Sequence, residues 1–137
     1  MTAPAPRAPR PRPALIAVVA AGGAVGTAAR EGLALVVPPL GRVPLAILLI
    51  NVVGAFVLGA LLEALVRRGP DEGRRRLVRL AVGTGFCGGF TTFSTLAVAT
   101  AELLRAGATG VALGYAVGSV VLGAVAAWTG VLVGSRS

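Results

Sequence analysis

The sequence predicts an all-α membrane protein with four transmembrane helices, the third of them broken at mid-membrane. Of its 137 residues, 55% are hydrophobic and 13% are charged, which leaves more apolar surface than a soluble domain of this size can bury. Four apolar runs each reach the ~20 residues that a bilayer core requires. In the third run, the stretch GFCGGFTTFST at residues 85–95 places three glycines and four hydroxyl side chains where an apolar helix is otherwise expected.

The four expected helices are joined by short connections and form one domain. They cover about residues 14–37, 43–65, 77–104 and 109–133, so residues 14–134 are assigned to a single four-helix transmembrane domain. Residues 1–13, MTAPAPRAPRPRP, are rich in proline, arginine and alanine. A segment of this composition cannot bury a core and is expected to form a disordered tail.

Glycine pairs with a spacing of four residues recur in the expected helices. They are Gly22/Gly26, Gly85/Gly89, Gly114/Gly118 and Gly130/Gly134. This spacing lets helix backbones approach closely in lipid. Plain helix packing is the favoured interpretation for most of these glycines.

The run at residues 85–95 is expected to unwind the third helix. Glycine weakens a helix, and the hydroxyls of Thr91, Thr92, Ser94 and Thr95 can bond the backbone groups that unwinding releases. In hydrocarbon, non-helical backbone is tolerated only where protein or a water-filled cavity covers it, and such broken helices are common ion sites. A merely kinked packing helix, whose threonines bond back to the preceding turn, remains the alternative.

Other polar and aromatic residues in the apolar spans favour an anion pathway. The amide of Asn51, near the middle of the second span, can donate to an anion. Tyr115 and Ser119 lie four residues apart and share one helix face. The ring edge of Phe93 is electropositive, although a buried phenylalanine is more often simply core. Arg30 either concentrates anions at an entrance or extends to the lipid headgroups.

The titratable residues limit the possible functions. The chain has no histidine, a single cysteine, and no acid deep in any span, since Glu63 and Glu102 lie near helix ends. Proton-coupled transport normally needs a buried carboxylate or histidine, so hydroxyl and amide donors alone favour a passive anion route. An enzyme is disfavoured because no nucleophile–base pair can be assembled.

The net charge of +8 lies on arginines between apolar runs, which favours membrane lipid over nucleic acid as a partner.

Three stretches resemble one known family. GFCGGFTTFST resembles the signature of the small bacterial fluoride channels, the Fluc/CrcB family. GGAVGTAAR is similar to that family's GG-x-x-G-x-x-x-R, and INVVGAFVLG is similar to its N-x-x-G-x-F-x-x-G. The resemblance covers about residues 14–134. It implies a channel domain that passively exports fluoride from the cytoplasm and so reduces its toxicity. It also implies an antiparallel dimer with two pores and a structural sodium ion at the dimer centre.

By motif position, the resemblance also implies roles for individual residues. The sodium ion is expected on the backbone carbonyls of Gly88 and Thr91, since a hard cation prefers oxygen ligands. The pore asparagine corresponds to Asn51, the first ring of the phenylalanine box to Phe93, and the vestibule arginine to Arg30. Four residues correspond to the hydroxyl track of the family: Ser94, Thr95, Tyr115 and Ser119.

The sequence departs from the family pattern at several positions. Leu96 stands where the phenylalanine box usually has its second ring, and Ala46-Ile47 replace a Gly-Thr pair in the second span. Gly123 stands where a further hydroxyl is expected, and Ala99 where an acid often follows the box. A pore formed wholly from the residues of this chain is therefore expected to conduct poorly.

The arginines are distributed unevenly between the two sides of a four-span protein. The tail, the second loop and the C-terminus share one side and carry ten arginines, against three on the other side, Arg30, Arg42 and Arg105. This bias predicts an inner (plasma) membrane protein with both termini in the cytoplasm. Two oppositely inserted copies would need a near-neutral bias. We therefore weigh a homodimer against a heterodimer with an oppositely oriented paralogue that supplies the missing ring and hydroxyls.

Two further functions compete with the channel interpretation. A proton-coupled exporter of the small multidrug type also forms antiparallel dimers, but it would need a carboxylate deep in the first span, and the one acid of that span, Glu31, lies in its last third. A non-conducting partner subunit of a heterodimeric channel would fit the altered phenylalanine box.

Overall fold

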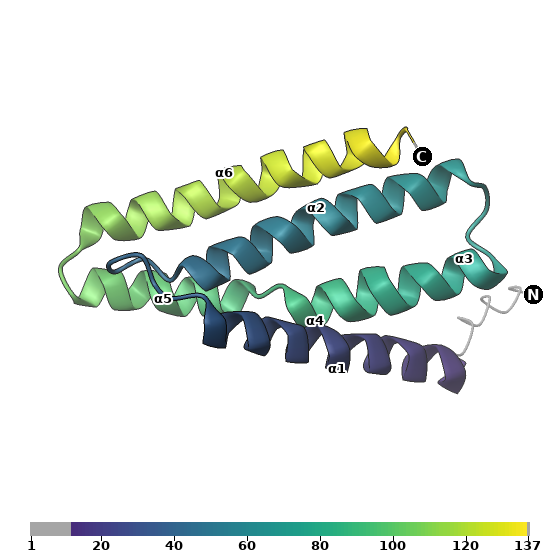
Figure 1. Cartoon of the computed structure of the whole chain (residues 1–137), viewed down its shortest axis with the longest axis horizontal. Helices are drawn as coiled ribbons and strands as arrows, with labels where there is room; N and C mark the ends of the chain where they lie inside the picture. The colour runs from purple at the N-terminus through teal and green to yellow at the C-terminus, as the bar shows by residue number, and fades with distance from the viewer. Residues whose placement is uncertain (1–11, 137) are drawn as a thin grey trace, which may run out of the picture.

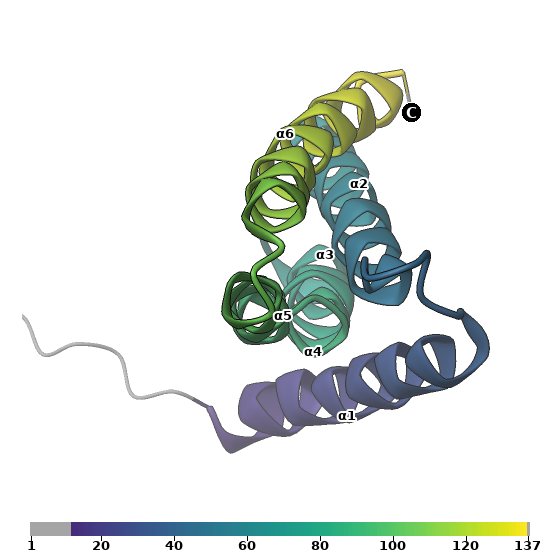
Figure 2. The same cartoon turned by 90° about the vertical axis from the view of Figure 1, so that its left-hand side faces the viewer.

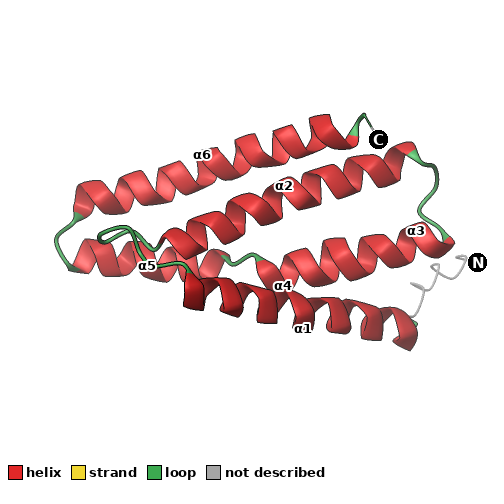
Figure 3. Ribbon diagram, viewed as in Figure 1, coloured by secondary structure: helices red, strands yellow, loops and turns green. Residues whose placement is uncertain are grey.

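Helices make up all the regular structure in the described part of the chain, residues 12–136 of this computed structural model, apart from one isolated β-bridge (Figure 3). In chain order the elements are α1 (Pro13–Val36), α2 (Leu45–Arg67), α3 (Gly73–Val78), the π-helical segment η1 (Arg79–Cys87), α4 (Gly88–Phe90), α5 (Phe93–Arg105) and α6 (Thr109–Gly134). The all-α prediction is confirmed. The predicted disordered tail lies outside the described residues except for Arg12 and Pro13.

Three helices are long and apolar enough to cross a membrane, namely α1, α2 and α6, with 24, 23 and 26 residues. At 1.5 Å per residue, each exceeds the ~30 Å of a hydrocarbon core. They correspond closely to the predicted first, second and fourth spans. The predicted third span, residues 77–104, is not one continuous helix but the series α3, η1, α4 and α5.

Proline and glycine mark several of the helix boundaries. Helix α1 begins at Pro13, where the missing N–H and fixed φ of proline suit the first helical turn. In the loop before α2, Leu40 and Val43 exchange two backbone hydrogen bonds of 2.9 and 3.0 Å. Gly41 lies between them with φ of 61°, a left-handed conformation that favours glycine.

The helices are arranged in two neighbouring pairs joined by α5 (Figures 1 and 2). Helix α2 packs along α6, helix α1 packs along η1 and α4, and α5 packs against α6. The start of α1, the end of α2, helix α3 and the end of α6 lie at one end of the molecule (Figure 1). The loops between α1 and α2 and between α5 and α6 lie at the opposite end, as an even number of spans requires.

Glycines allow both helix pairs to approach backbone to backbone. A Cβ atom would collide with the main chain of the facing helix at six of the glycines predicted to pack: Gly22, Gly26, Gly85, Gly89, Gly130 and Gly134. At Gly26, for example, it would overlap the carbonyl of Phe86. The predicted packing role is confirmed for these three pairs. Gly114 and Gly118 differ, since a Cβ there would meet no facing atom within 4 Å among residues 12–136.

The buried core surrounds the junction of α4 and α5. Its members come from α2, α4, α5 and α6 and are Ile47, Ile50, Phe90, Leu96, Leu103, Ala112 and Tyr115. Ile50 is fully buried. By contrast, α6 leaves Val117, Val120 and Trp128 more than 60% exposed. This distribution brings the polar stretch of the predicted third span into the best-packed region of the chain.

Candidate functional site

The helical backbone is interrupted at Thr91 and Thr92, between α4 and α5. Thr91 has φ of −77° and ψ of 155°, and Thr92 has φ of −149° and ψ of 118°, so both residues are extended. The preceding segment, η1, is π-helical, a rare geometry that is frequent at functional sites. The extended residues are threonines. Gly85, Gly88 and Gly89 lie within the helical segments upstream.

Asn51 of α2 bonds both main-chain groups of Thr92. Its Nδ2 donates to the Thr92 carbonyl at 3.0 Å, and the Thr92 N–H donates to Asn51 Oδ1 at 2.8 Å. One amide side chain thus gives the extended residue the pair of hydrogen bonds that a neighbouring strand would give. This satisfies backbone groups that would be costly to leave unpaired away from water.

The Thr92 hydroxyl contacts one threonine and one serine of α5. As the residue before α5, Thr92 accepts a hydrogen bond from the Thr95 N–H at 3.2 Å, which caps the helix. The hydroxyls of Ser94 and Thr95 lie 3.2 and 3.0 Å from Thr92 Oγ1. Both were predicted site residues, whereas Thr92 was expected only to bond the released backbone. The helix-capping preference of threonine was the sequence signal for its central place.

A pocket of about 230 Å³ opens beside the interruption. It is lined by Asn51, Thr91, Thr92, Phe93, Leu96, Ser119 and Val120. Three residues of the predicted anion pathway therefore share one pocket: Asn51, Phe93 and Ser119. Its lining contains amide and hydroxyl groups, one aromatic ring and no charged side chain.

The other predicted pathway residues lie outside this pocket. Tyr115 is buried one turn from Ser119, whose hydroxyl donates to the Tyr115 carbonyl at 2.6 Å. The Tyr115 hydroxyl is buried and has no hydrogen-bond partner among residues 12–136. Arg30, on α1, is half-buried, does not line the pocket and forms no salt bridge with any described residue. The structure therefore does not bring Arg30 to the other site residues.

The carbonyls of Gly88 and Thr91 lose their helical donors at the interruption. In a continuous helix, Gly88 would accept from the Thr92 N–H and Thr91 from the Thr95 N–H. Those two N–H groups bond Asn51 Oδ1 and Thr92 Oγ1 instead. Neither carbonyl accepts a hydrogen bond in the described part of the chain. Two free main-chain oxygens fit the needs of a hard cation such as sodium.

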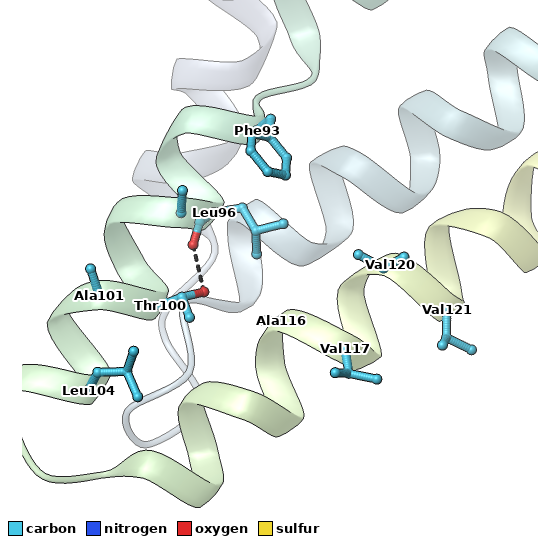
Figure 4. A pocket seen from close by; sticks show the side chains of 10 residues that line it. Phe93, Leu96, Thr100, Ala101, Leu104, Ala116, Val117, Val120 and Val121 are labelled. Carbon is cyan, nitrogen blue, oxygen red and sulfur yellow. Dashed lines mark hydrogen bonds between the residues drawn. The ribbon is translucent and has the colours of Figure 1, made fainter.

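An apolar groove lies between α5 and α6, next to the pocket (Figure 4). It has a volume of about 560 Å³, and its ten lining residues include Phe93, Leu96, Thr100, Val117 and Val120. The Phe93 ring is 78% exposed. The described chain therefore leaves this ring largely uncovered, beside the apolar groove that it lines.

Charged side chains form ion pairs away from the pocket. Arg67 contacts Glu63 at 2.6 Å near the end of α2, and Arg79 contacts Asp71 at 2.7 Å. The hydrogen bond from Arg79 lowers the pKa of Asp71 below its ordinary value, so this exposed carboxylate stays charged at neutral pH. The pair ties the loop before α3 to the first residue of η1. No cluster of three or more His, Cys, Asp or Glu side chains suited to a metal occurs within residues 12–136.

Comparison with known proteins gives a consistent family assignment. The family model described as "CrcB-like protein, Camphor Resistance (CrcB)" matches residues 17–131. A protein of Leifsonia xyli subsp. xyli, named fluoride-specific ion channel FluC 2, is 49% identical over 118 residues, which cover 86% of this chain and 81% of the relative. Cutibacterium acnes FluC 1 is 47% identical over 118 residues (85% and 82%), and Deinococcus radiodurans FluC is 46% identical over 123 residues (86% and 93%).

Proposed function

Because this chain belongs to the CrcB family, we propose that it forms a fluoride-selective channel that lets the ion leave the cytoplasm down its own gradient. The observation that carries this proposal is the pocket at the interrupted helix. Amide and hydroxyl groups from α2, the interruption and α6 meet there, beside an aromatic ring and without a charged group. The proposed activity is conduction and involves no catalysis.

The donors that line the pocket, together with the hydroxyls beside Thr92, suit the replacement of the water shell of a small halide. An amide carries two N–H hydrogens, so Asn51 keeps one after donating the other to Thr92. The hydroxyls of Thr92, Ser94 and Thr95 lie close enough to share hydrogens and can reorient toward an anion. The electropositive edge of the Phe93 ring adds a further favourable contact. In the selectivity filters of cation channels, carbonyl oxygens replace the water shell of the ion, and here hydrogen-bond donors would replace the water shell of an anion.

The acidic residues support passive conduction over proton coupling. Glu63 pairs with Arg67 and Asp71 with Arg79, both away from the pocket. Glu102 lies near the end of α5, beyond the pocket lining. A proton-coupled exporter would need a titratable group along the route, and the pocket offers none.

We propose that a second subunit of opposite orientation covers the groove between α5 and α6. The exposed Phe93 ring would then contact the partner. Four glycines of α6 that face no other element in the described part of the chain would allow close approach: Gly110, Gly114, Gly118 and Gly123. Under this arrangement the interrupted third span also crosses the membrane, which brings the number of transmembrane segments to four. Its break then lies at mid-membrane.

We further propose that sodium binds at the dimer centre through the carbonyls of Gly88 and Thr91. The support is that both carbonyls have lost their helical donors. Gly88 is also exposed in the single chain, with open space where a Cβ would lie. The ion would supply positive charge that satisfies carbonyl oxygens in a region without water.

The charge distribution supports an orientation with both termini in the cytoplasm of an inner membrane. Eight of the ten arginines on the predicted cytoplasmic side lie within the described residues: Arg12, Arg67, Arg68, Arg74, Arg75, Arg76, Arg79 and Arg136. The helix ends that carry them lie together at one end of the molecule (Figure 1). So strong a bias favours one orientation per chain. It therefore favours a heterodimer with an oppositely oriented paralogue over a homodimer.

A second candidate function is a partner subunit that does not conduct alone. Leu96 favours it, because this residue lines the pocket where the second ring of the family's phenylalanine box is expected. An aliphatic side chain lacks the quadrupole of that ring. In this case the paralogue would complete the pore.

Fluoride efflux from liposomes tests these proposals. Vesicles loaded with potassium fluoride and supplied with valinomycin should release fluoride, measured with a fluoride electrode, while vesicles loaded with chloride should not. Release by the chain alone supports a homomeric channel, and release only with a co-purified paralogue supports the partner-subunit alternative. Fluoride retention in both preparations would reject the channel proposal, and release that depends on a proton gradient would support an exporter.

A further inference from the structure

We propose that α2 positions the interrupted segment through two contacts one helical turn apart. In the first, the Asn51 amide holds the main chain of Thr92. In the second, the absence of a side chain at Gly54 leaves room for the methyl group of Thr91. Asn51 and Gly54 are three residues apart and so face the same side of α2. The effect on conduction rests on the proposed function, whereas the contacts themselves can be tested without it.

The Asn51 contact fixes the direction of the extended backbone. Its amide accepts from the Thr92 N–H at 2.8 Å and donates to the Thr92 carbonyl at 3.0 Å. Reversing or tilting the Thr92 peptide groups would break both bonds together. Asn51 is therefore a positioning residue in addition to any direct contact with an anion through its second N–H.

The Gly54 contact fixes the place of Thr91. Gly54 is buried, and a Cβ added there would overlap the Cγ2 methyl of Thr91. The next nearest atoms are Phe90 Cδ1 at 3.4 Å and Thr91 Cβ at 3.7 Å, which are ordinary van der Waals contacts. A single methyl group is thus the only obstacle to a side chain at position 54. Thr91 also holds its own rotamer, since its hydroxyl donates to the Cys87 carbonyl at 2.9 Å.

This geometry predicts a specific rescue. Gly54→Ala should displace Thr91 and reduce fluoride efflux by about tenfold or more, since misplacing a positioned group by ~1 Å can cost ~100-fold. Thr91→Ser removes the Cγ2 methyl but keeps the hydroxyl that bonds Cys87. The double variant Gly54→Ala/Thr91→Ser should therefore return to within about threefold of the Thr91→Ser single variant, a residual of less than 1 kcal/mol.

Gly59→Ala supplies the matched control in the same helix. A Cβ at position 59 would meet the main-chain carbonyl of Ala127 on α6, which no substitution at Thr91 can move. Thr91→Ser should leave the Gly59→Ala defect unchanged. The proposal is overturned if Thr91→Ser fails to rescue Gly54→Ala, or if it rescues both glycine variants equally.

The same variants separate this proposal from the proposed function. Thermal unfolding midpoints of all variants in detergent should show the same rescue of Gly54→Ala and the same lack of rescue of Gly59→Ala. If the wild-type chain moves no fluoride, alone or with a paralogue, but this pattern of midpoints holds, then the function fails and the positioning role stands. If fluoride moves but the pattern is absent, the positioning role fails alone.

Hydrogen–deuterium exchange tests the Asn51 contact directly. Asn51→Ala should speed exchange of the Thr92 amide by about tenfold or more, because its acceptor is lost. Ser119→Ala, which alters the same pocket without touching Thr92, should leave that amide unchanged. Unchanged exchange in Asn51→Ala, or equal acceleration in both variants, would contradict a positioning role for Asn51.

Discussion

At the scale of single residues, most side-chain polar groups near the interruption have two uses. Asn51 bonds the backbone and also lines the pocket. The Thr92 hydroxyl caps α5 and lies within hydrogen-bond distance of two further hydroxyls. Such shared groups hold the pocket in shape while leaving hydrogens that can turn toward an ion. The hydroxyls of Ser119 and Tyr115 differ from these, and each leads to a prediction.

Ser119→Ala should reduce fluoride efflux with little effect on stability. The Ser119 hydroxyl donates to the Tyr115 carbonyl within α6, a bond that contributes little to helix stability. Its single hydrogen would turn from that carbonyl toward a passing anion, and this bond is expected to account for about tenfold in flux. Liposome efflux measures the effect.

Ser135→Ala is the matched control, since the Ser135 hydroxyl bonds the Leu132 carbonyl in the same way, far from the pocket. It should stay within about twofold of wild type. Equal losses in the two serine variants would contradict a pathway role for Ser119.

Tyr115→Phe should separate stability from conduction. The Tyr115 hydroxyl is buried without a partner in the described structure, and burying an unpaired hydroxyl costs about 1–3 kcal/mol. Deleting it should raise the free energy of unfolding by up to about 1 kcal/mol while fluoride efflux falls. A variant that is less stable and conducts normally would show that this hydroxyl has a structural partner and no place in the pathway.

At the scale of helices, glycine determines which pairs are rigid. The α1 and η1–α4 backbones approach so closely that Gly26 faces the main chain of Phe86 with no side chain between them. A main-chain obstacle cannot rotate away as a side chain can. The same holds for α2 and α6 at Gly130 and Gly134. These two pairs form the fixed frame on which α5 rests.

Gly26→Ala should destabilise the chain, and Gly32→Ala should not. The added methyl at position 26 would overlap the Phe86 carbonyl, and overpacking of this kind costs about 2 kcal/mol or more. At Gly32, in the same helix, no atom lies within 4 Å, so alanine should stabilise the helix by about 1 kcal/mol. Thermal unfolding in detergent measures both. A tolerated alanine at position 26 would contradict the close backbone contact.

The hydrophobic runs were sufficient to predict three of the helices, because a membrane helix extends about as far as its run of apolar residues. They predicted α1, α2 and α6 closely. They could not predict η1, because a π-helical hydrogen-bond pattern depends on which carbonyl each N–H selects and leaves no trace in composition. The run at residues 85–95 was expected to unwind, and the extended residues within it are Thr91 and Thr92.

The residues of the site could be predicted from the sequence, but the hydrogen bonds that join them could not. Asn51, Phe93 and Ser119 were predicted separately and share one pocket. The pairing of Asn51 with Thr92 was not predicted, because it joins residues 41 positions apart and depends on how α2 packs against the interruption. Arg30 was predicted from its charge within an apolar span and from its motif position, but it does not line the pocket, and its helix α1 packs against η1 and α4.

At the scale of the whole molecule, the charge asymmetry predicts one orientation in the membrane. A cysteine added after the C-terminus of a Cys87→Ser variant should react with impermeant reagents only from the cytoplasmic side. The native Cys87 is 2% exposed, and it is replaced by serine so that the added cysteine is the only thiol that a reagent can label. Replacing Arg68, Arg74, Arg75 and Arg76 with glutamine should shift the chain toward mixed orientation, since these arginines contribute strongly to the bias.

Arg105→Gln is the control for this experiment, because it removes charge from the opposite side and should leave the orientation single. Labelling of the added C-terminal cysteine from both faces in equal amounts, with all the arginines kept, would support a homodimer of oppositely inserted copies. It would contradict the heterodimer proposal.

The wide hydrogen-bond ladder of η1 gives this segment slack that a regular α-helix lacks. Deleting one residue there would let the ladder close to the ordinary four-residue spacing. The closure would absorb the missing residue, so the downstream segment would stay aimed at α2. Deleting one residue from the α-helix α2 offers no such slack and would turn the rest of that helix by about 100°.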